Sequence, residues 1–461
     1  MAAIFQTLQR EAQEVGISPV PPARRALGLG DMFVLWADLG ISFLVMVVGM
    51  FLVPGLGLGQ AFLAILIGAV IGNLLLGLAA IPGSTTGVPT MVLLRGPLGQ
   101  RGSYLPTVLN ILQLLGWAAF EVIVMAQAAD LLATRFLGWP PAYHAWALGF
   151  TLLTLALALG GPILVVKQWM EKFAVWAVLV TTVWITAALL ATADLGALLA
   201  RPGTGELSFW LAVDLVVAMP ISWFPLVADY SRFARDRRAA FWGTAAGYFV
   251  PHVWFYALGA LLVLAAGVTA DPAAPIAPLL TAIAGLTAGW VALLVLLVDE
   301  TDEGFANVYS TAVSLQNLVP QASQRGLIVL VSAVVLLLAW TVPLTQYESF
   351  LLLIGSAFVP LLGVLAADYF VLRGGHYDAA ALLQPTGALG YTAGVCWPAL
   401  AIWLAGVAVY LTISGLPALG VPGLAPWLGA SLPSFLTTFV LSLVAGRAWV
   451  RRPAPAPLGE A

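Results

Sequence analysis

Apolar runs of about 20 residues recur along almost the whole chain, and most charged residues lie between them. A helix needs about 20 consecutive apolar residues to cross a bilayer, whereas barrel strands show alternation over about 10. The pattern predicts an all-α polytopic membrane protein. We expect twelve transmembrane helices, at residues 32–53, 60–82, 104–132, 144–161, 169–192, 209–228, 240–267, 284–314, 327–343, 347–371, 390–413 and 426–448.

The charges between the apolar runs predict the orientation. If the N-terminus is inside, every Lys and Arg except Arg135 and Arg201 falls on the inner side. Inner loops of membrane proteins carry such an excess of positive charge. We therefore expect a multi-pass protein of the cell (inner or plasma) membrane with both termini cytoplasmic. The expected parts are a cytoplasmic N-terminal segment, a transport core, two further transmembrane helices and a cytoplasmic tail, at residues 1–31, 32–371, 389–449 and 450–461.

Composition excludes several other classes of protein. Hydrophobic residues make up 61% of the 461 positions and charged residues 8%, which is typical of a membrane protein and of no soluble domain. The chain has no phosphate-binding Gly-x-x-x-x-Gly-Lys-Ser/Thr loop, and its three histidines match no metal-ligand spacing. We therefore expect no enzyme activity, no cofactor and no nucleic-acid partner.

The order of the runs indicates an internal repeat. Spans one to five and six to ten have similar lengths, and because five is odd, a duplicated five-helix unit would sit inverted in the membrane. In such transporters the sites lie where the first helix of each half is interrupted. Span one contains Asp38-Leu39-Gly40, and span six contains the stretch Met219–Pro225, in which Pro220 and Pro225 each lack a backbone donor. A simple proline kink is the alternative explanation for span six.

Span eight contains four of the 21 acidic residues within five positions, Asp299, Glu300, Asp302 and Glu303. A helix that ends near Val298 would place them in a solvated loop. A helix that continues would place Asp299, Asp302 and Glu303 on one face of a polar site, because they are spaced i, i+3 and i+4. Buried carboxylates are costly in hydrocarbon, so the second interpretation requires a cavity, a partner or an ion.

Span three contains Trp117 and Glu121, four residues apart and hence on one helix face. An indole offers a flat stacking surface, and a carboxylate one turn later can accept hydrogen bonds from ring amino groups. This pair suits a planar nitrogen heterocycle. The alternative is that Trp117 only packs and that Glu121 pairs with a buried arginine or stays protonated.

Several motifs resemble the nucleobase–cation symporter-1 family, within it the cytosine and hydroxymethylpyrimidine permease branch. They are residues 82–106, Gly116-Trp117, residues 222–233, residues 307–310, residues 347–350, Pro360 and residues 367–369. The resemblance covers roughly residues 24–372. It implies a leucine-transporter-type fold of five plus five inverted helices with two C-terminal helices added. It also implies import of a nucleobase-like heterocycle with a co-transported proton or sodium ion, and no metal beyond a possible transported sodium.

The resemblance also implies roles for particular residues. The substrate-binding positions would be Trp117, Glu121, Ser42, Met219, Ser222 and Trp223. The cation or proton positions would be Asp38, Ile41, Asp299, Asp302 and Glu303. This alignment moves the acidic stretch into the middle of helix eight and favours the continuous helix.

The acids are the main departure from the family pattern, which has neutral hydroxyl groups at the positions of Asp302 and Glu303. Several acids within a few ångströms of one another, with Asp38 opposite, cannot all stay ionised. We hypothesise that at least one carries a proton, although a cationic substrate would need the same acids. A carboxylate at Glu121 suits an aminopyrimidine better than uracil. An uncoupled facilitator and a same-fold transporter of amines or amino acids remain alternatives.

Overall fold

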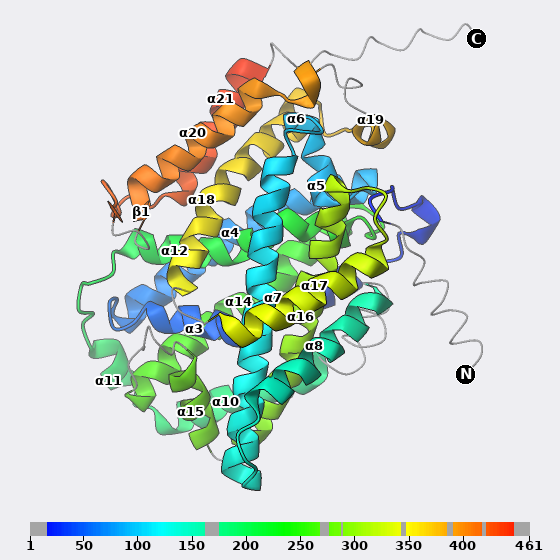
Figure 1. The fold of residues 1–461 in the computed structure, drawn as a ribbon. Coiled ribbons are helices and arrows are strands. Elements are labelled where there is room, and N and C mark those ends of the chain that lie inside the picture. The colour runs from blue at the N-terminus through cyan, green and yellow to red at the C-terminus, as the bar shows by residue number, and fades with distance from the viewer. Residues whose placement is uncertain are drawn as a thin grey trace, which may run out of the picture.

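The computed structural model describes residues 16–161, 175–267, 276–286, 289–342, 347–384, 391–416 and 421–446. The start of the expected N-terminal segment (1–15), the expected tail (450–461) and the inner-loop lysines Lys167 and Lys172 lie outside the described residues. The described part is a bundle of long helices, and α7 runs through its middle (Figure 1).

The helices of the first half follow the predicted spans. They are α2 (Leu29–Asp38), α3 (Phe43–Phe51), α4 (Leu58–Thr86), α5 (Thr90–Leu93), α6 (Arg95–Leu98), α7 (Tyr104–Leu132), α8 (Tyr143–Gly160), α10 (Val175–Thr192) and α11 (Leu195–Ala200). A 3-10 helix (Pro22–Arg24) precedes α2, and a π-helix (Ala133–Leu137) extends α7.

The second half contains α12 (Phe209–Ser222), α13 (Val227–Ser231), α14 (Arg237–Ala266), α15 (Ala277–Gly285), α16 (Gly289–Leu318), α17 (Gln324–Thr341) and α18 (Tyr347–Ala366). The chain continues with a π-helix (Ala367–Leu372), α19 (Ala379–Leu383), a 3-10 helix (Thr392–Gly394), α20 (Trp397–Ser414) and α21 (Ser431–Gly446). Strands β1 (Gly415–Leu416) and β2 (Val421–Pro422) form a short antiparallel ladder between the last two helices.

Each of the twelve predicted spans coincides with a helical segment. Eight helices in the described residues are long and apolar enough to cross a membrane, or nine if the bent pair α2 and α3 is one span. Helices α10 and α21 are apolar but shorter in the described part. Helix α16 is 30 residues long and carries the four acids. The all-α membrane architecture is confirmed, and the count of twelve stays a prediction.

The packing of the helices reflects a duplicated unit. Helix α2 packs on α14 as α12 packs on α4, α7 packs on α17 as α16 packs on α8, and α7 contacts α8 as α16 contacts α17. The counterparts α4 and α14, α7 and α16, and α8 and α17 also pack on each other. These contacts are preserved when each helix of residues 29–192 is exchanged for its counterpart in residues 209–366. A two-fold relation between the halves explains this pattern.

Close packing of α4 against α12 fixes the position of span six. A Cβ atom added to Gly68 would lie 2.6 Å from Val216, and one added to Gly72 would lie 2.4 Å from Pro220. Small residues allow two membrane helices to approach in this way. The Gly68-x-x-x-Gly72 motif therefore serves helix packing, and it brings Pro220 against α4.

Candidate functional site

The first span is interrupted where the sequence predicted it. Helix α2 ends at Asp38, and α3 begins at Phe43 at an angle of 61°. The hydroxyl of Ser42 accepts a hydrogen bond from the amide of Leu44 at 3.1 Å and caps α3. The N-terminal amides of a helix favour negative charge. Here the amide of Phe43 donates to Oε1 of Glu300 at 2.5 Å, so the break places a helix N-terminus against an acid of span eight.

The interruption of span six lies at the end of the predicted stretch Met219–Pro225. Helix α12 continues through Met219 and Pro220 to Ser222, so the first proline does not end the helix. The change comes at a 3-10 helix, Phe224–Leu226, which contains Pro225 and leads into α13. The ring of Pro220 lies close against Gly72 of α4. Trp223 therefore sits at the end of α12, beside the break.

Helix α16 is continuous through the acidic stretch, which excludes the loop interpretation. Asp299, Glu300, Asp302 and Glu303 are all buried, with at most 5% of each side chain exposed. The side chain of Asp302 is a neighbour of Asp38 at the end of α2. Two buried carboxyl groups so placed are unfavourable when both are ionised.

The glutamates form a second group on the same helix. Carboxyl oxygens of Glu121, Glu300 and Glu303 lie within 4.8 Å of one another, and all three residues are buried. The Ser42 side chain lies beside the carboxyl groups of both Glu300 and Glu303. One acidic helix thus joins α2, α3 and α7 at the break. Three oxygen ligands at this spacing could also hold a hard cation.

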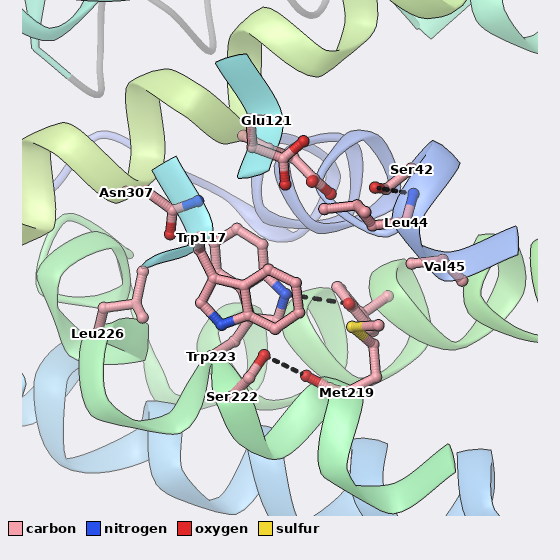
Figure 2. Close-up of a pocket in the computed structure, with 12 residues that line it drawn as sticks. Ser42, Leu44, Val45, Trp117, Glu121, Met219, Ser222, Trp223, Leu226 and Asn307 are labelled. Atoms are coloured by element: carbon pink, nitrogen blue, oxygen red, sulfur yellow. Dashed lines mark hydrogen bonds between the residues drawn. The ribbon is translucent and has the colours of Figure 1, made fainter. Parts of the chain in front are cut away.

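A cavity opens beside the glutamates. Its empty space is about 320 Å³, a figure that includes space open to solvent. It is lined by Ser42, Leu44, Val45, Trp117, Glu121, Met219, Ser222, Trp223, Leu226, Tyr248, Glu303 and Asn307. In Figure 2 the two labelled indoles lie between Glu121, Asn307 and Ser42 on one side and Met219 and Ser222 on the other. The arrangement can hold a planar ring whose polar edge faces carboxyl and amide groups.

Neighbouring aromatic rings fix the two indoles. Trp117 makes edge contacts with Tyr347 and Phe350 of α18, at ring-centre distances of 5.7 and 5.3 Å. The indole N–H of Trp223 donates to the hydroxyl of Tyr248 at 3.0 Å. Trp36 of α2 contacts the Trp223 ring edge-on at 5.8 Å. The rings are therefore held by both halves of the protein.

All six predicted substrate-binding residues line this cavity. Of the predicted cation positions, Glu303 lines it, and Asp38, Ile41, Asp299 and Asp302 are buried around the break. The hydroxyl of Ser222 donates to the carbonyl of Met219 at 2.6 Å, which directs its proton back into its own helix.

Sequence reasoning missed Glu300, Asn307 and Tyr248 as site residues. Glu300 precedes Glu303 by three residues and Asn307 follows it by four, so helical spacing from Glu303 could have found both. Tyr248 lies in an apolar stretch of α14, where no pattern distinguishes it from a packing residue.

The comparisons with known proteins identify the family of the chain. A family model described as "Permease for cytosine/purines, uracil, thiamine, allantoin" matches residues 19–429. The chain belongs to this permease family. The family is one of transport proteins, and the permease is a multi-pass membrane protein.

Individual relatives are similar over most of their length. The hydantoin permease of Microbacterium maritypicum is 27% identical over 452 residues, which cover 91% of this chain and 90% of the relative. The cytosine permease of Escherichia coli (strain K12) is 28% identical over 368 residues, covering 77% and 80%.

The permease is also similar to the solved structure of Mhp1, a nucleobase-cation-symport-1 family transporter, in a closed conformation with bromovinylhydantoin bound. The TM-score is 0.80 at 23% identity, covering 95% of this chain and 96% of that chain. This likeness confirms the predicted fold, a leucine-transporter-type inverted repeat.

Proposed function

We propose that the permease is a secondary active transporter that imports a nucleobase-like heterocycle, of the cytosine or hydroxymethylpyrimidine class, together with a cation. The observation that carries this proposal is the cavity at the break of span one, where Trp117, Trp223, Glu121, Glu303 and Asn307 meet. Aromatic faces stack on planar rings, and the polar groups bind the ring edge. The names of the relatives support the same class of substrate.

We expect the binding of the ion and of the substrate to be coupled, because the two sites share helices around the break of span one. The ion or proton would bind among Asp38, Ile41, Asp299, Asp302 and Glu303, on α2, the break and α16. The substrate would bind on α3, α7, α12 and α16. Because both ligands favour the same arrangement of the break, each raises the affinity of the other, as symport requires.

We further propose that a proton is the coupling ion. Asp38 and Asp302 are neighbouring buried acids, and a proton on one of them relieves the repulsion between two charges, whereas a sodium site built from neutral hydroxyl groups needs no proton. The termini would be cytoplasmic, as the distribution of Lys and Arg indicates. Alternating access would then carry the proton and the substrate inward in one step.

The test is uptake of radiolabelled cytosine into liposomes, with proton and sodium gradients imposed separately. We expect accumulation with the proton gradient and loss of accumulation in Asp302→Asn. The matched control is Asp378→Asn, an exposed acid that caps α19, where Asn can still accept the cap hydrogen bond. Uptake driven equally by sodium at constant pH, with Asp302→Asn unaffected, would eliminate proton coupling. Equilibration without accumulation under both gradients would indicate a facilitator.

A further inference from the structure

The cavity is lined by acidic groups and by no basic group. Its twelve lining residues include the carboxyls of Glu121 and Glu303, and none of the twelve is Lys, Arg or His. His252 is close by in α14, but its ring faces Tyr256 and its Nδ1 lies 3.1 Å from the amide of Asn73 in α4. The lining residues therefore offer no positively charged partner to the carboxyl groups of Glu121 and Glu303.

Glu300 adds a third carboxyl directly behind the lining. Its Oε1 accepts the amide of Phe43, whereas its Oε2 and the Oε2 of Glu121 receive no hydrogen bond from an amide, hydroxyl or basic group in the described part of the chain. A buried charge without a partner costs several kcal/mol. The three glutamates therefore leave hydrogen-bond acceptors for a ligand that brings N–H donors or positive charge.

Asn307 is a further polar residue of the cavity and is not one of the acids. The amide of Asn307 lines the cavity, is 3% exposed, and makes no side-chain hydrogen bond within the described residues. An amide can accept from a ring N–H or an exocyclic amino group through its oxygen, and it can donate to an unprotonated ring nitrogen through its NH2 group. Indole rings such as Trp117 and Trp223 attract a planar cation more strongly than other aromatic side chains do. A small inorganic ion held by oxygen ligands would leave the two indoles unused.

We infer that the cargo is a positively charged planar heterocycle with an amidinium-like edge. Its N–H groups would donate to Glu121 and Glu303, and its ring would lie between Trp117 and Trp223. This inference rests on the proposed function and narrows its substrate class, because a neutral ring with two carbonyls would present acceptors to acceptors. A cation–carboxylate pair of this kind forms two parallel hydrogen bonds.

The experiment compares benzamidine, a planar aromatic amidinium, with benzamide, its neutral isostere, by calorimetric titration of the full chain in detergent. We expect wild-type protein to prefer benzamidine by about tenfold or more, the range for hydrogen bonds to a charged partner. Glu121→Gln and Glu303→Gln should each lose most of this preference. Glu206→Gln, at an exposed loop position, should retain it. Liposomes preloaded with benzamidine should also take up labelled benzamidine by counterflow.

The outcomes separate this inference from the proposed function. Equal or weaker binding of benzamidine in wild-type protein, with cytosine still bound and transported, would overturn the cationic cargo and leave heterocycle import standing. Absence of binding and exchange for all three probes, cytosine included, would overturn both. The wild-type comparison needs no variant, so misfolding of a glutamate variant does not affect it.

Discussion

Asp368 and Glu121 are both buried acids in long apolar helices. Asp368 is paired with a basic side chain, whereas Glu121 lies beside other acids. Asp368 accepts hydrogen bonds from Arg373 at 2.9 Å and from the hydroxyl of Tyr377 at 2.6 Å. Arg373 also donates to the hydroxyl of Tyr391 at 2.8 Å. Burial and the nearby Asp368 carboxylate raise the pKa of Tyr377 well above its usual value, so this phenol remains a donor at physiological pH.

Glu121 has acids where Asp368 has donors. Its nearest ionisable partners are Glu300 and Glu303, and it borders a cavity. A buried acid that is paired within the chain stabilises one structure, whereas a buried acid left for a ligand makes the site depend on that ligand. The comparison supports a structural role for Asp368, whereas Glu121 is the acid that we propose for substrate binding.

The largest expected effect is a loss of stability when Asp368 loses its partner Arg373. Arg373→Ala leaves Asp368 buried without its cation, which should lower the free energy of unfolding by about 3–5 kcal/mol. Thermal unfolding in detergent measures this, with Arg101→Ala at an exposed position as the control. If the two variants unfold at the same temperature, Asp368 does not depend on its partner and the comparison fails.

The second effect is a reduction of cytosine uptake when an acid of the cavity is neutralised. Glu303→Gln should reduce cytosine uptake by about tenfold to a hundredfold, because a hydrogen bond to a charged group is lost. Its unfolding temperature should equal or exceed that of wild type, since the removed charge faces other acids. Uptake and unfolding are measured on the same preparation. A fall in uptake that merely follows a loss of folded protein would give Glu303 a structural role.

The smallest effect is at a third buried acid, Asp214 of α12, which accepts the amides of Ala430 and Ser431 at the start of α21. Asp214→Asn keeps one acceptor and loses the charge, so it should cost about 0.5–2 kcal/mol of stability. Uptake per folded molecule should not change. Asp194→Asn, at the exposed cap of α11, should cost less. Reduced uptake at full stability would link α21 to transport.

Much of the fold could be predicted from the sequence, because a bilayer requires apolar runs of about 20 residues and favours positively charged loops on its inner side. The break at Asp38-Leu39-Gly40 could be located because polar and small residues interrupt an apolar run there. The break of span six was predicted only as the stretch Met219–Pro225, and the structure places it at the second proline. Either proline could end the helix by its sequence alone, because both lack a backbone donor.

The site was predictable in part for a similar reason. Trp117 and Glu121 stand out on one face of span three. The acids of span eight were expected on a single face, but they divide between two groups of partners. Glu300 reaches the amide of Phe43, which is free only because span one breaks and turns by 61°. A tertiary contact of this kind leaves no periodic signal in either segment.

An experimental structure of the permease with a bound heterocycle is the most direct test of the central claim. We expect a planar ring between Trp117 and Trp223, with its nitrogen-bearing edge toward Glu121, Glu303 and Asn307. A ligand bound elsewhere, with Glu121 and Glu303 turned away from it, would contradict the account.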